Sequence, residues 1–147
     1  MSPFVQQILR LMNTELDRIE ESINRLSDIH FWTRLRENTS SIGNLCVHLA
    51  GNEYQNIVSG IGGKPFIRER SSEFAGNDGM KGKELIIYLR DIRKQSEEIL
   101  NKLTDIQLEK DVRIKYSEQD WYRMKQRDNT KADQYIRFLL HRLYLFT

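Results

Sequence analysis

Cysteine and long apolar runs are scarce in this 147-residue sequence. Cys46 is the only cysteine, and one cysteine cannot form an internal bridge, so a disulfide scaffold is excluded. No stretch approaches the roughly 18 consecutive apolar residues of a membrane span. Residues 1–11 lack the basic start and apolar core of a signal peptide. We therefore expect a cytoplasmic protein with no membrane partner.

Charge of one sign is also scarce. Lys and Arg number 23 against 21 Asp and Glu, which leaves a formal net charge of +2. Between Tyr116 and Arg127 aromatic residues alternate with basic ones, a composition suited to stacking on bases and contacting phosphates. Glu118, Asp120 and Asp128 dilute that positive charge. We therefore expect no nucleic-acid partner.

Proline is rare enough to permit long helices, since only Pro3 and Pro65 are present. Apolar residues recur at steps of 3 and 4 in four segments. These segments predict helices over residues 3–27, 41–59, 82–104 and 131–146. The only short candidate for a strand, residues 112–116, is isolated. The sequence therefore predicts an all-α fold, a single four-helix bundle domain over residues 1–147.

Local signals support the helix starts and the bundle end. Ser2 followed by Pro3 is typical of an N-cap and a first helical residue. Residues 38–41 read Asn-Thr-Ser-Ser and offer capping side chains for the second helix. Phe31 and Trp32, between the first two helices, are expected to cap the end of the bundle.

The three histidines are His30, His48 and His141, and any metal site must draw on them. A helical wheel places His48 beside Asn44, Asn52 and Gln55 at the edge of the apolar stripe. There an imidazole can face a cleft and receive the orienting hydrogen bonds that metal-bound histidines require. The alternative is a half-buried histidine within a helix interface, and taken alone the residues favour it.

The loop after the second helix holds two further patterns. Residues 60–64 read Gly-Ile-Gly-Gly-Lys, but no strand precedes them and no Lys-Ser or Lys-Thr closure follows, so a phosphate loop is rejected. Residues 68–73 read Arg-Glu-Arg-Ser-Ser-Glu. We expect these to be solvated charges that pair with each other; the alternative is an arginine site for a carboxylate or phosphate.

Residues 41–53 read SIGNLCVHLAGNE, residues 60–63 read GIGG and residues 68–74 read RERSSEF. With these motifs the chain resembles the DinB-like superfamily, in the branch with SIGNLxxHLxGN and ReRSSEF signatures. The resemblance implies an up-down-down-up bundle, often homodimeric, with a divalent metal held by three histidines. One of these lies on the second helix and two form an HxxxH pair on the fourth. Characterised relatives include thiol S-transferases, a maleylpyruvate isomerase and proteins first described as metal-dependent hydrolases.

By this resemblance His48 fits the ligand position on the second helix, and His141 fits the first of the pair on the fourth. Leu145 occupies the third ligand position. A three-histidine site leaves positions open where a bound water or thiol becomes acidic and nucleophilic. With leucine at one position the affinity should fall, and Glu53 would be an ad hoc substitute ligand.

Two function hypotheses follow. The first is a DinB-like protein with a degenerate divalent-metal site for Zn, Ni or Fe between the second and fourth helices, as a candidate metal-dependent thiol S-transferase or hydrolase. The alternative is a metal-free bundle that acts as a binding or dimerising module. The partners expected are a small-molecule ligand or thiol and a second copy of the chain. A homodimer is expected because Leu139, Leu143 and Leu145 leave the predicted fourth helix apolar on more than one face.

Overall fold

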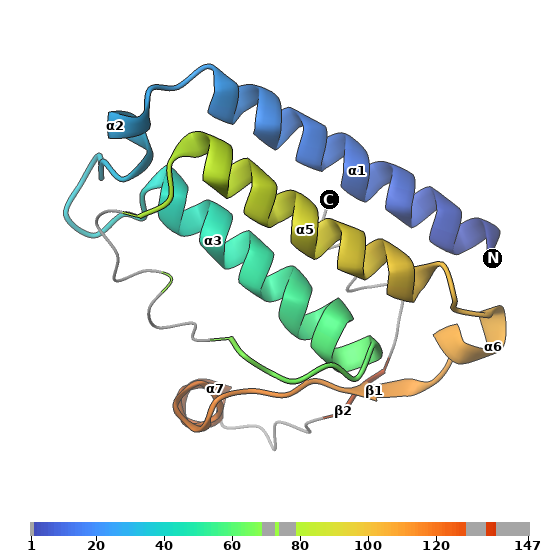
Figure 1. Cartoon of the computed structure of the whole chain (residues 1–147). Helices are drawn as coiled ribbons and strands as arrows, with labels where there is room; N and C mark the ends of the chain where they lie inside the picture. Colours follow the sequence, from blue (N-terminus) through green and yellow to red (C-terminus); the bar gives the residue numbers. More distant parts are fainter. Residues whose placement is uncertain (1, 69–72, 74–78, 129–134, 138–147) are drawn as a thin grey trace.

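Three long helices lie side by side in the computed structural model, which describes residues 2–68, 73, 79–128 and 135–137 (Figure 1). They are α1 (Pro3–Asn24), α3 (Ile42–Glu53), which continues as the π-helix η1 (Tyr54–Ile61), and α5 (Gly82–Leu100). The helix α5 lies between the other two and packs against both. The all-α fold class is confirmed.

The helices α3 and α5 run parallel to each other and antiparallel to α1 (Figure 1). The three long helices α1, α3 and α5 thus run up, down and down in chain order. A fourth helix would complete the predicted topology, but most of residues 131–146 lies outside the described residues.

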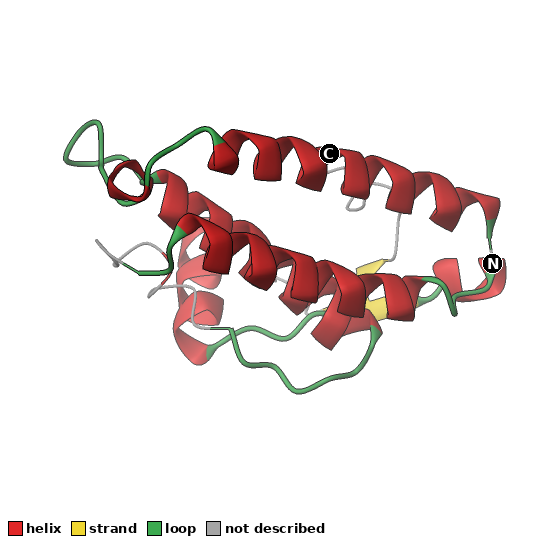
Figure 2. Ribbon diagram, turned by 45° about the horizontal axis from the view of Figure 1, so that its top comes forward, coloured by secondary structure: helices red, strands yellow, loops and turns green. Residues whose placement is uncertain are grey.

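The remaining elements are short. They are α2 (Asp28–Phe31), α6 (Asp105–Leu108), β1 (Asp111–Arg113), α7 (Glu118–Asp128) and β2 (Tyr135–Arg137). The two strands pair antiparallel, and β1 contacts η1, so this ribbon lies beside the end of the second long helix (Figure 2). Among the described residues, no helix is both long enough and apolar enough to cross a membrane.

The helix predicted over residues 131–146 is wrong where it can be compared, because Tyr135–Arg137 forms β2. The pairing sets Ile136 opposite Val112 in β1, and β-branched residues are enriched in strands. The sequence showed 112–116 as an isolated strand because its partner lies more than 20 residues further on. The helix α7 was not predicted; Ser117 Oγ accepts a hydrogen bond from the Asp120 backbone N–H at its start, a capping signal of the Ser-x-x-Asp type.

The cap of α3 and the packing at the bundle end agree with the sequence-based predictions. Ser41 Oγ accepts from the Asn44 backbone N–H while Asn44 Oδ1 accepts from the Ser41 backbone N–H, which completes a capping box. Phe31 is 1% exposed and packs in the core, and Trp32 Nε1 donates to the Met80 carbonyl. The prediction that Phe31 and Trp32 close the bundle end is confirmed.

The core consists of two apolar clusters, one toward each end of the long helices. The first gathers around Leu16, Ile23, Phe31, Ala50, Leu85 and Leu89, and the second around Val5, Ile8, Met12, Ile57 and Leu100. On each long helix polar residues separate the two clusters: Asn13 on α1, Glu53 on α3, and Arg93 and Glu97 on α5.

These polar residues form one hydrogen-bonded layer across the three helices. Arg93 Nε and Nη2 donate to the two Glu53 carboxylate oxygens at 2.8 and 2.9 Å, and Arg93 Nη1 donates to Asn13 Oδ1 at 3.0 Å. Asn13 Nδ2 donates to Glu97 Oε1. Glu53 is therefore held by a buried guanidinium, and its suggested role as a substitute metal ligand is not supported by this geometry.

Replacing Glu53 by Ala should lower the free energy of unfolding by about 3–5 kcal/mol, because it leaves the Arg93 guanidinium buried without its counter-charge. Urea denaturation followed by circular dichroism measures this change. Glu98→Gln removes an exposed acid from α5 and should change stability by no more than about 0.5 kcal/mol. A Glu53→Met, Arg93→Met double variant should recover much of the loss; an equally unstable double variant would contradict this account.

Candidate functional site

The connection between α3 and α5 brings charged side chains onto α3. Because the two helices are parallel, the chain that leaves η1 must return along the full length of the second helix before α5 can begin. Twenty residues, 62–81, make this return, and α3 with η1 spans about 30 Å. Arg68 and Glu73 lie on this segment and pack against α3 at Gly51.

Arg68 and Glu73 form a buried, bidentate ion pair. Arg68 Nε donates to Glu73 Oε1 at 2.7 Å and Arg68 Nη2 donates to Glu73 Oε2 at 2.9 Å. Each side chain is 5% exposed. For Arg68 and Glu73, the two charged residues within 68–73 that the structure describes, the predicted pairing is confirmed, but the expectation that they are solvated is wrong. The matched geometry of guanidinium and carboxylate offsets the cost of removing both charges from water.

His48 joins the ion pair through one ring nitrogen. Its Nδ1 lies 3.0 Å from Glu73 Oε2 and 3.0 Å from Arg68 Nη2, and its side chain is 26% exposed. A single nitrogen either donates a proton or accepts one. With a proton on Nδ1 the ring donates to Glu73; without it, Nδ1 accepts from Arg68.

Glycine at position 51 lets the ion pair approach the helix backbone. A Cβ at this position would collide with Glu73 Oε1 and lie 3.0 Å from Arg68 Nε. Only a residue without a side chain leaves this room, so Gly51 is required by the close approach and not by its backbone angles.

Side-chain amides of the second helix anchor both ends of the charged segment. Asn44 Nδ2 donates to the Glu73 carbonyl at 2.9 Å, and Gln55 Oε1 accepts from Arg68 Nη1 at 2.5 Å. Gln55 also donates through Nε2 to the Lys115 carbonyl, next to β1. Asn44 and Gln55 had been placed beside His48 by the helical wheel; in the structure they hold the residues that contact His48.

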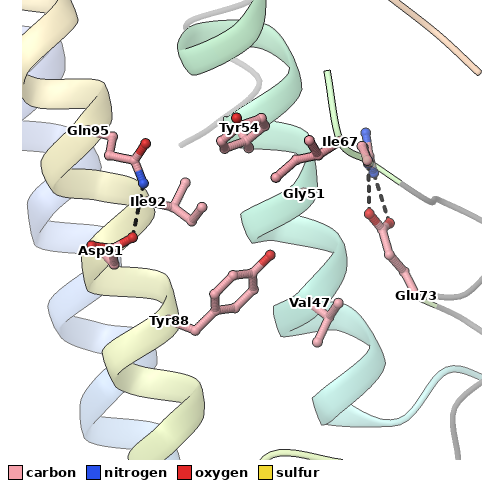
Figure 3. Close-up of a pocket in the computed structure, with 10 residues that line it drawn as sticks. Val47, Gly51, Tyr54, Ile67, Glu73, Tyr88, Asp91, Ile92 and Gln95 are labelled. Atoms are coloured by element: carbon pink, nitrogen blue, oxygen red, sulfur yellow. Dashed lines mark hydrogen bonds and ion pairs between the residues drawn. The ribbon is translucent and has the colours of Figure 1, made fainter. Parts of the chain in front are cut away.

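A pocket of about 370 Å³ opens between α3, α5 and residues 67–68, next to the ion pair (Figure 3). Val47 and Gly51 line it from α3, Tyr88 and Ile92 from α5, and Tyr54 from the start of η1. Burial raises the pKa of the Tyr88 phenol, and the Glu73 carboxylate raises it further while Arg68 opposes the shift. The Tyr88 hydroxyl therefore stays protonated at neutral pH.

The predicted metal ligands are only partly within the described residues. His48 lies in the site, while His141 and Leu145 fall outside the described residues. His30 is exposed on α2. The described part of the chain contains no group of three His, Cys, Asp or Glu side chains that could hold a metal ion.

Sequence reasoning missed the buried contact of Arg68 and Glu73 with His48. The contact joins residues 20 and 25 positions apart, and no periodicity reports such a distance. Gly51 was the available signal, because a glycine inside a helix often marks a close approach of another segment.

Cys46 is not a nucleophile in this fold. It packs in the first apolar cluster at 4% exposure, and burial raises the pKa of its thiol to about 11. The reactive species is the thiolate, which is scarce at neutral pH when the pKa is so high.

Labelling of Cys46 with a disulfide reagent such as 5,5′-dithiobis(2-nitrobenzoate) should be slow in the native protein and fast in urea. Because the folded state raises the pKa from its ordinary value near 9 to about 11, the folded state keeps its proton where the unfolded state loses it. Stability should therefore fall as pH rises from about 9 to 11. Native labelling as fast as in urea would contradict the burial.

The cost of a methyl group at Gly51 should depend on Glu73. In the unaltered protein Gly51→Ala should lower the free energy of unfolding by about 1–3 kcal/mol, because the new methyl displaces the ion pair. In a Glu73→Ala background the same change should be neutral or stabilising, since alanine favours a helix over glycine by up to about 1 kcal/mol. Urea denaturation of the unaltered protein, the two single variants and the double variant gives the coupling energy between positions 51 and 73. An equal cost of Gly51→Ala in both backgrounds would disprove the contact.

Comparison with known families matches residues 1–139 to a family model described as "Protein of unknown function (DUF1572)". The matched range includes His48, Arg68 and Glu73 and stops before His141. No curated protein and no solved structure matches the chain. Since the family model covers nearly the whole sequence, the chain belongs to the DUF1572 family, which is a DinB-like family.

Proposed function

We propose that this chain has a degenerate divalent-metal site in which His48 and His141 are the protein ligands, for Zn, Ni or Fe, and that it is a candidate metal-dependent thiol S-transferase or hydrolase. The observation that carries the proposal is the Glu73 carboxylate 3.0 Å from His48 Nδ1. Metal-bound histidines usually donate their second ring nitrogen to such a carboxylate.

The Glu73 carboxylate influences which ring nitrogen of neutral His48 carries the proton. When Nδ1 donates to Glu73 Oε2, the neutral ring carries its lone pair on Nε2, the nitrogen that would hold the ion. When Nδ1 accepts from Arg68 Nη2, the proton moves to Nε2 and that nitrogen cannot act as a ligand. Glu73 and Arg68 therefore favour opposite tautomers, and the ligand role requires Glu73 to prevail.

The residues present fit such a group only in part. The described residues supply one imidazole and its orienting carboxylate, so His141 has to supply the second ligand. Leu145 at the third family position leaves the set one ligand short and should weaken binding. A bound divalent ion would supply the acidification of a water or thiol that hydrolysis or thiol transfer needs.

Elemental analysis of protein purified without a His-tag, followed by zinc titration, tests the metal site. His48→Ala and His141→Ala should each abolish zinc binding, while His30→Ala, which removes the exposed histidine, should leave it unchanged. Leu145→His should tighten binding by about tenfold or more, because it restores a third imidazole.

Zinc binding that survives His141→Ala, or that does not improve with Leu145→His, would show that His141 and Leu145 are wrongly aligned with the family's ligand positions. The absence of zinc binding in all these proteins would favour the second hypothesis.

The second hypothesis is a metal-free binding or dimerising module. The observation that favours it is the buried Arg68 guanidinium, whose Nη2 lies 3.0 Å from His48 Nδ1 and can satisfy that nitrogen without any metal. The homodimer and the detailed branch within the DinB-like proteins stay predictions.

A further inference from the structure

The pocket beside the ion pair combines an apolar floor with polar groups at its mouth. Val47 and buried Ile92 form apolar walls, and the rings of Tyr54 and Tyr88 lie on opposite sides, from η1 and α5 (Figure 3). Asp91 and Gln95 line the solvent side, one turn apart on α5. A ligand that fits must therefore have an apolar body and a polar end directed toward α5.

The polar lining offers several hydrogen-bond acceptors, beside the protonated Tyr88 hydroxyl, which can also donate. The Tyr54 hydroxyl donates its proton to the Pro65 carbonyl at 3.0 Å, so it offers a ligand an oxygen lone pair. Asp91 Oδ2 accepts from Gln95 Nε2 at 2.9 Å, and no basic side chain lies within ion-pair distance of the Asp91 carboxylate among the described residues. Arg68, the cation of the lining, is already neutralised by Glu73.

An ammonium group already binds at this rim. The exposed side chain of Lys64, on the segment leaving η1, donates from Nζ to Gln95 Oε1 at 3.1 Å. The chain's own lysine thus shows which kind of group the polar side of the pocket accepts. Lys64 reaches Gln95, and no basic residue in the described part of the chain forms an ion pair with Asp91, so this carboxylate can receive a second cation.

We propose that this pocket binds a small primary amine with an apolar body, with the protonated amine bound by Asp91 and the body held against Val47, Ile92 and the two tyrosine rings. A carboxylate or phosphate ligand is disfavoured, since Asp91 repels it and the guanidinium of Arg68 is committed to Glu73.

This site is separate from the nitrogen of His48 that would hold a metal, although both include Glu73 in their surroundings. Amine binding needs no metal, so it is measured in the presence of EDTA. A failure of the metal proposal therefore leaves the amine test unaffected, and the reverse also holds.

Three probes of similar shape and different charge test the proposal by isothermal titration calorimetry. They are 2-phenylethylammonium, its neutral analogue 2-phenylethanol and the anion phenylacetate. The ammonium should bind most tightly, the alcohol about three- to fivefold more weakly, as expected for one partly solvated ion pair, and the anion weakest.

Variants test whether the ammonium is bound at Asp91. Asp91→Asn should weaken the ammonium about three- to fivefold and leave 2-phenylethanol unchanged. Glu98→Gln removes the same charge two turns further along α5 and should leave the affinities for the ammonium and for 2-phenylethanol unchanged. Lys64→Gln should tighten binding of the ammonium, because it removes a neighbouring positive charge from the rim.

Three results would overturn the proposal. They are phenylacetate binding as tightly as the amine, equal effects of Asp91→Asn and Glu98→Gln, and no binding of the ammonium at millimolar concentration.

Discussion

The parallel run of α3 and α5 is the constraint on which the candidate site depends. Two antiparallel helices can be joined by a short turn, but two parallel neighbours need a connection that returns over the length of the first. Here that connection passes along α3 and brings Arg68 and Glu73 to Gly51 and His48. The segment is therefore part of the site, and the pocket beside it exists because residues 67–68 lie over the gap between the two helices.

Two buried ion pairs hold the second helix from different sides. Glu53 is fixed by Arg93 of α5, and Gly51 receives the Arg68–Glu73 pair from the connection. Burying charges costs free energy that a pair only partly recovers, so such pairs are better explained by the arrangement they specify. Apolar clusters at the two ends would tolerate some sliding of α3 against α5, but the Glu53 carboxylate meets the guanidinium in one register only.

The sequence predicted the features that repeat or lie close together along the chain. Steps of 3 and 4 located α1, α3 and α5 to within a few residues at most ends, and Ser41 with Asn44 marked a cap that the structure contains. Features that join distant residues were missed or misjudged: the burial of Arg68 with Glu73, the pairing of β1 with β2, and the partner of Glu53. The pairing of Arg68 with Glu73 was predicted because both lie in one short segment, but their burial depends on contact with α3 at Gly51, and the partner of Glu53 lies on α5.

The chemistry of the site depends on whether Glu73 or Arg68 determines which ring nitrogen of His48 carries the proton. Glu73 and Arg68 are bound to each other and both reach Nδ1 at 3.0 Å, so a small shift of the pair favours one tautomer over the other. Arg68 and Glu73 are among the residues that line the adjacent pocket, so a ligand there can reach the same pair. A molecule that draws Glu73 toward the pocket would favour the contact of Nδ1 with Arg68 and would withdraw the Nε2 lone pair. The buried ion pair therefore connects the pocket lining to His48 through direct contacts.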